Sequence, residues 1–163
     1  MPDIAEMLSQ TVQALGGSAR LEGVSITPQF LSGQAPAPLR GMHAVAGLGS
    51  LEYAPGAMGG YLGDNETGEQ SGRRVNISLS ITLYAPYETG GSGLFTIYSA
   101  VSDCLFAAKL PYSVKRGKAG SISFDKALRA YKLECAFEAE GYAADELCFE
   151  PFDSVEVELV RPV

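Results

Sequence analysis

The stretch VNISLSITLYAPYETGGSGLFTIYSAVSDCL, Val75 to Leu105, decides the fold of this chain. Its first half alternates apolar and polar side chains, the period of a β-strand with one buried face. The polar positions of this strand are Asn76, Ser78, Ser80 and Thr82. After a glycine-rich turn, with Ser92 as the expected N-cap, apolar residues recur at helical spacing from about Leu94 to Lys109. The stretch therefore predicts a strand packed on one amphipathic helix.

Working outward, apolar spacing predicts an opening helix over residues 3–15, with Asp3 as its N-cap. A short strand follows at residues 24–30, where Pro28 favours a sheet edge. Further strands are expected over residues 39–53 and at Tyr112–Lys115, Ser121–Phe124, Leu128–Glu140 and Ser154–Val160. Strands and helices do not alternate regularly, so we predict an α+β fold: an antiparallel or mixed sheet with two helices on one face.

Residues 54–73 form a polar stretch rich in glycine, with little that belongs in a core. We expect a long flexible loop there, an insertion within one domain spanning residues 1–163. Tyr61 and Leu62 are its candidate contact residues, because a loop of this length can become ordered against a partner.

The charge and the cysteines limit the possible partners. The formal net charge is −7, and the few basic residues are scattered, which argues against direct DNA or RNA binding. No apolar run approaches the roughly 20 residues of a membrane-spanning helix. Three cysteines without C-x-x-C spacing, and no signal peptide, indicate free thiols in a reducing cytoplasm.

Few residues offer catalytic chemistry. His43 is the sole histidine, so any catalytic triad must use it, and no nucleophile motif lies nearby. A structural role for His43 is the better interpretation. Paired carboxylates such as Glu138 and Glu140 occupy polar strand positions, where they favour solubility. We therefore expect no enzyme activity, no metal and no cofactor.

Two surface features are candidates for protein contact. The polar face of the strand at Asn76–Thr82 carries no charge, which suits a contact surface, although a solvated face of an antiparallel sheet is the plainer alternative. Lys115, Arg116 and Lys118 surround Gly117 in what reads as a hairpin tip. They form either a solvated turn or a contact to an acidic protein surface.

The chain resembles the tail terminator, or tail completion, proteins of long-tailed bacteriophages, including those of prophages and phage-derived contractile particles. The resemblance rests on the opening helix PDIAEMLSQTVQALG, the segment RRVNISLSITLYAPYETGGSGLFTIYSAVSDCL and the return GSISFDKALRAYKLECAFEAEGYA with its Phe124-Asp125 pair. It covers most of the chain apart from residues 32–73.

The resemblance implies a hexameric ring that caps the tail tube, ends tube or sheath polymerisation and provides the surface that joins the head. Implied partners are other copies of the chain, the tube protein, and sheath and head–tail joining proteins, with DNA passing through the lumen unbound. The implied location is the virion tail or a phage-tail-like particle, made in the bacterial host cytoplasm. The alternatives are another tail, neck or baseplate ring component, or a stand-alone ligand-binding or enzymatic α+β domain.

Overall fold

The computed structural model describes residues 4–28, 40–55, 61–65 and 68–144. The helices are α1 (Ile4–Gly16) and α2 (Leu94–Ala107), with the short 3₁₀ helices η1 (Ala19–Leu21) and η3 (Tyr87–Thr89). The strands are β1 (Ser25–Pro28), β2 (His43–Pro55), β3 (Tyr61–Asn65), β4 (Gly68–Pro86), β5 (Tyr112–Asp125) and β6 (Ala130–Ala144).

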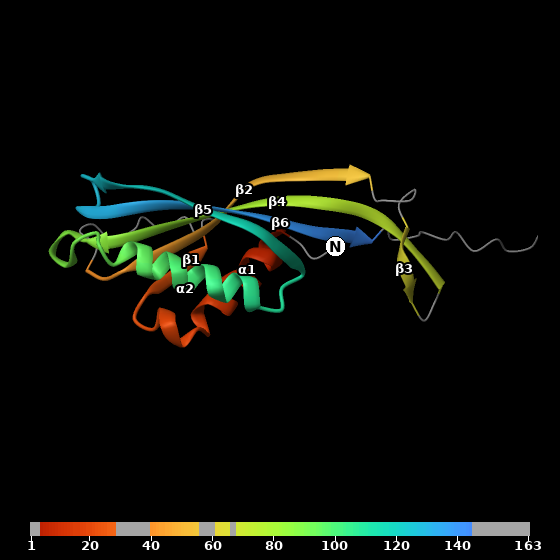
Figure 1. Cartoon of the computed structure of the whole chain (residues 1–163), viewed down its shortest axis with the longest axis horizontal. Coiled ribbons are helices and arrows are strands. Elements are labelled where there is room, and N and C mark those ends of the chain that lie inside the picture. Colours follow the sequence, from red (N-terminus) through yellow and green to blue (C-terminus); the bar gives the residue numbers. More distant parts are fainter. Residues whose placement is uncertain (1–3, 29–39, 56–60, 66–67, 145–163) are drawn as a thin grey trace, which may run out of the picture.

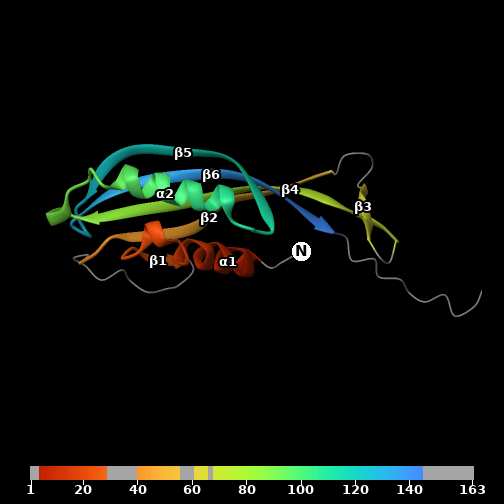
Figure 2. The same cartoon turned by 60° about the horizontal axis from the view of Figure 1, so that its bottom comes forward.

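The main sheet has the order β1-β2-β4-β6-β5. The β1–β2 pair is parallel and the other pairs are antiparallel, while β3 pairs with the start of β4. Both helices lie on the same face of this sheet (Figures 1 and 2). The predicted α+β fold, a mixed sheet with two helices on one face, is confirmed. β1 contains Pro28 and lies at an edge among the described strands, as expected of a strand containing proline.

The core lies between the sheet and the two helices. The inward row of β4 is at most 3% exposed and consists of Val75, Ile77, Leu79, Ile81 and Leu83. It meets apolar residues of α2 such as Leu94 and Val101, which are also buried. Burying one such side chain stabilises the fold by about 1.5–3 kcal/mol. The alternation in the sequence thus predicted the buried face correctly.

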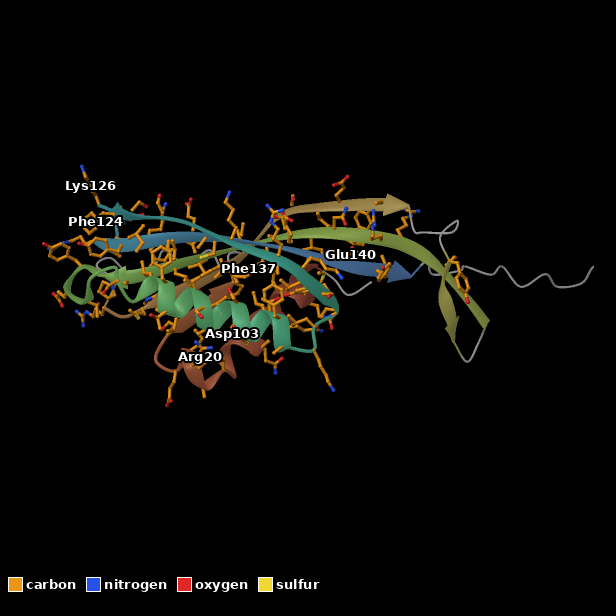
Figure 3. All side chains as sticks on the ribbon, in the orientation of Figure 1. Arg20, Asp103, Phe124, Lys126, Phe137 and Glu140 are labelled. Carbon is orange, nitrogen blue, oxygen red and sulfur yellow. The ribbon has the colours of Figure 1, made fainter. Side chains whose placement is uncertain are left out.

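Phe137 of β6 is fully buried, and its ring lies 5.9 Å from that of Tyr98 on α2. Gly117 of β5 faces the Phe137 ring: a Cβ at Gly117 would stand 2.8 Å from Phe137 Cε1. At the other side of α2, Arg20 of η1 pairs with Asp103 (Figure 3). These contacts fix α2 against both β5 and the α1–η1 segment.

Two local predictions were wrong. The N-cap of α2 is Gly93 and makes no side-chain hydrogen bond, so Ser92 is not the cap. The two short strands expected at Tyr112–Lys115 and Ser121–Phe124 are one strand, β5. The pairing of β5 with β6 shifts register twice, at Val114/Arg116 and Ala119/Ile122. Each bulge interrupts the alternation of side chains, so one strand looked like two.

Within residues 54–73, where we expect a flexible loop, the structure describes strand residues. Tyr61–Asn65 is strand β3, and β4 begins at Gly68 instead of near Val75. The backbone groups of β3 pair with residues 68–71, so apolar side chains were not needed for strand formation. Residues 56–60 and 66–67 lie outside the described residues, as do Asp3 and the predicted strand Ser154–Val160.

Candidate functional site

The candidate site is the sheet face turned away from the helices, called here the open face. Asn76, Ser78, Ser80 and Thr82 of β4 lie on it, and all four are half-buried by neighbouring strands. In the parts of the chain that the structure describes, both helices pack on the opposite face (Figure 2). The central row of the open face is therefore uncharged and has no helix over it.

The register of the sheet gives each of these residues two neighbours. Ser78 lies between Ser50 of β2 and Glu138 of β6. Ser80 lies between Gly47 and Ala136, so the middle of the open face is built from small residues. The remaining pairs are Asn76 with Glu52 and Glu140, and Thr82 with Val45 and Glu134.

A groove crosses the open face where two bulges align. Gly49 is the extra residue of β2 and Lys115 that of β5, and both lie at the level of Ser78 and Glu138. Bulges bend a strand and increase its twist, so two at one level curve the sheet there. The groove has a volume of about 470 Å³ and is lined by Ser50, Glu52, Asn76, Ile77, Ser78, Lys115, Glu138, Ala139 and Glu140.

Three carboxylates and one ammonium group give the groove its charge. Tyr142, next to it on β6, donates a hydrogen bond from Oη to Glu140 Oε1 at 2.9 Å. This bond, together with the nearby negative charge, raises the pKa of the exposed Tyr142 phenol. Glu140 is labelled in Figure 3. Among the described residues, no group of three His, Cys, Asp or Glu side chains is arranged to hold a metal ion.

The structure brings some predicted contact residues together and separates others. Asn76, Ser78 and Lys115 line one groove, although they come from strands that are not neighbours. Lys115, Arg116 and Lys118 lie within β5 and not at a hairpin tip, because the β5–β6 turn falls after Asp125. Tyr61 lies apart on β3 and is 44% exposed, while only the backbone of Leu62 is described.

The groove also contains residues that the sequence analysis did not select. Ser50 and Glu52 reach it from β2, and Glu138 and Glu140 had been interpreted only as solubilising. Their polar alternation was visible in the sequence, but their meeting depends on strand order and on the bulge at Gly49. A Cβ at Gly49 would lie 3.2 Å from Ser78 Oγ, so glycine permits this close approach.

The residues considered for catalysis have ordinary structural surroundings. His43 Nδ1 is 2.8 Å from the Gly41 carbonyl oxygen, and the residue is half-buried at the start of β2. Cys104 and Cys135 are free thiols, and burial raises the pKa of both, that of Cys135 to about 12. Burial therefore disfavours the nucleophilic thiolate at neutral pH. Cys148 lies outside the described residues.

No family model matches this chain, and no curated protein matches it. Among solved structures, the chain is similar to one described as "Virion of native gene transfer agent (GTA) particle". The two are 19% identical, the match covers 88% of this chain and 100% of the other, and the TM-score is 0.49. Within the described part of the chain, no helix is long and apolar enough to span a membrane.

Proposed function

We propose that this protein is a structural, non-enzymatic component of a phage tail or phage-tail-like particle. In its specific form, the protein forms a hexameric ring that caps the tail tube, ends polymerisation and provides the joining surface for the head. The class of particle comes from the resemblance of the quoted helix and strand segments to tail terminator proteins. The observation that carries an assembly role is the open face of the sheet.

The chemistry of the open face suits burial between protein subunits. Its central row, Asn76 to Thr82, offers hydroxyl and amide groups but no charge, and its middle has small side chains because Ser80 lies between Gly47 and Ala136. The cores of protein interfaces are depleted in charged residues, with polar residues around them. Here the charged residues stand around this row, on β5 and β6 and at Glu52.

A closed ring needs two different patches on each subunit, because its contacts are head-to-tail. The β3–β4 hairpin supplies a second surface. It lies at one end of the molecule, beyond the ends of β2 and β6 (Figure 1). A two-stranded hairpin alone is marginally stable in water, so contact with a neighbouring subunit would stabilise it. Tyr61, at the start of this hairpin, is the residue we place in that contact.

The charge of the chain is compatible with a lumen that DNA traverses. A net charge of −7 repels phosphates. The remaining partners in this proposal are the tube protein, and sheath or head-joining proteins where the particle has them. Another ring component of the tail, neck or baseplate would use the same open face.

The test compares two arginine substitutions by native mass spectrometry and by capping of tubes made from the cognate tube protein. Ser80→Arg places a charge in the middle of the open face. Thr96→Arg places the same charge on the exposed side of α2. We expect wild type and Thr96→Arg to give rings of six times 17.2 kDa and to cap tubes, and Ser80→Arg to remain monomeric and folded. Rings of Ser80→Arg that cap tubes normally would refute the role of the open face.

One observation favours a second candidate, a stand-alone ligand-binding domain. The groove volume of about 470 Å³ falls within the range of small-molecule sites. Such a domain would be monomeric in the presence of tube protein. The mass measurement therefore separates the two functions.

A further inference from the structure

One flank of α2 exposes two large apolar side chains. Phe95 is 49% exposed and Phe106 is 53% exposed. At 100° per residue, these two and Ser102 fall on the same flank of the helix. The Ser102 hydroxyl is shielded from solvent and has no hydrogen-bond partner among the described residues. The opposite flank packs on α1, where the Cys104 thiol donates to the Ala14 carbonyl at 3.3 Å.

This apolar flank faces the edge strand β5. Tyr98, on the same side of α2, would have its Oη 3.2 Å from a Cβ placed on Gly117. Figure 2 shows α2 between β5 and α1, so the flank turned away from α1 lies on the β5 side. Among the described strands, β5 pairs with β6 alone and is the end of the sheet. A strand beside β5 would therefore lie under Phe95 and Phe106.

The other face of β5 is cationic. Lys115, Arg116 and Lys118 are all exposed, and no ion pair within 4 Å joins them to a carboxylate in the described part of the chain. A strand that fits this position needs apolar side chains toward α2 and carboxylates toward the open face, alternating with a period of two.

The chain contains such a segment. Residues 154–160 read SVEVELV, with Val155, Val157 and Leu159 alternating with Glu156 and Glu158. The segment lies outside the described residues. As a strand, the row from Val155 to Leu159 would span about 13 Å. This length is close to the separation of about 16 Å between Phe95 and Phe106 along the helix axis.

The connection is long enough to stay within one chain. β6 is described as far as Ala144, and residues 145–153 would span up to about 30 Å if fully extended. The edge position lies two strands from β6, about 10 Å away. Because Gly141 pairs with Tyr112, the C-terminal part of β6 lies beside the start of β5. The segment would then run parallel to β5, with Val155 near Phe106.

We propose that residues 154–160 add to the free edge of β5 of the same chain as a further strand. Val155, Val157 and Leu159 then cover Phe95 and Phe106, and Glu156 and Glu158 lie beside Arg116 and Lys118. Lysines and bulges on an edge strand also protect against unwanted pairing. If preventing such pairing were their only role, however, Phe95 and Phe106 of α2 would remain exposed to water. The proposal does not depend on ring formation.

Hydrogen exchange on the full chain tests the docking. Val157→Lys places a charge under α2, and Val163→Lys is the matched control in the same tail. We expect amides 116–119 of β5 to exchange at least about tenfold faster in Val157→Lys, with no change in the control. The same amides also test the proposed charge contact. The double variant Arg116→Glu with Lys118→Glu should accelerate their exchange. Adding Glu156→Lys with Glu158→Lys should restore the slower exchange of wild type. Unchanged exchange in Val157→Lys would overturn the proposal.

A disulfide distinguishes the source of the strand. Phe106→Cys and Val155→Cys are combined in a chain whose Cys104 and Cys148 are replaced by serine. We expect an oxidised monomer with the two cysteines joined. A disulfide-linked dimer would mean that a second copy supplies the strand, and the absence of any cross-link would mean that another surface covers β5. Either result would overturn the proposal as stated.

Discussion

Gly117 is the position where the smallest substitution should have the clearest effect on stability. An alanine Cβ there would lie 2.8 Å and 2.9 Å from two ring carbons of Phe137, and 3.2 Å from Tyr98 Oη. Contacts under 3.0 Å force movement, and the Phe137 ring is fully buried. Gly117→Ala must therefore displace either the ring or β5.

The magnitude follows from two opposing terms. Overpacking a core costs about 1–3 kcal/mol. Replacing glycine by alanine at a compatible backbone returns about 0.4–1 kcal/mol by restricting the unfolded chain. We expect a net loss of about 1–2 kcal/mol, which lowers the melting temperature by about 2–8 °C for a protein of this size.

The control is Gly120→Ala on the same strand, where the nearest atom would be the Glu134 carbonyl oxygen at an ordinary 3.4 Å. Thermal unfolding followed by circular dichroism should rank Gly120→Ala at or above wild type and Gly117→Ala below it. Adding Phe137→Leu to Gly117→Ala should cost less than the sum of the single changes, because a smaller side chain relieves the clash. A melting temperature of Gly117→Ala equal to that of Gly120→Ala would refute the packing of Gly117 against Phe137.

Three further predictions concern stability. The buried Tyr112 hydroxyl lies 2.5 Å from Thr11 Oγ1, and Thr11→Val leaves it without this partner. Urea titrations should show a loss of about 1–3 kcal/mol in the free energy of unfolding, part of which is regained when Tyr112→Phe is added. Burial raises the pKa of the Cys135 thiol from 9.0 to about 12, so the stability that the buried neutral thiol contributes is complete below pH 9 and is lost as the pH rises toward 12. In urea titrations across this range, the free energy of unfolding should therefore fall less with pH in Cys135→Ala than in wild type. Arg20→Ala should cost under about 1 kcal/mol by thermal unfolding, because its ion pair with Asp103 is exposed.

The sequence predicted those parts of the fold whose pattern is local. The alternation from Val75 to Leu83 and the helical spacing after Leu94 each arise within one element, so the strand, the helix and their buried faces could be predicted. The β5 strand could not, because its bulges at Lys115 and near Gly120 break the period of two. Residues 61–65 were missed because their strand is held by backbone pairing in a polar, glycine-rich segment.

The candidate site depended on information that no local pattern carries. Asn76 and Ser78 were selected because their strand face lacks charge. Lys115 was selected separately as a turn residue, and Glu52 was not selected. These residues meet because β4 lies between β2 and β6, with β5 beyond β6. Strand order of this kind follows from the packing of the whole chain.

The most direct test of the assembly role is electron cryomicroscopy of the protein assembled with its tube protein. We predict a single ring at one end of each tube, with the open face around Ser80 buried against protein. A ring in which Asn76 to Thr82 all face solvent, or a protein that stays monomeric beside complete tubes, would contradict it.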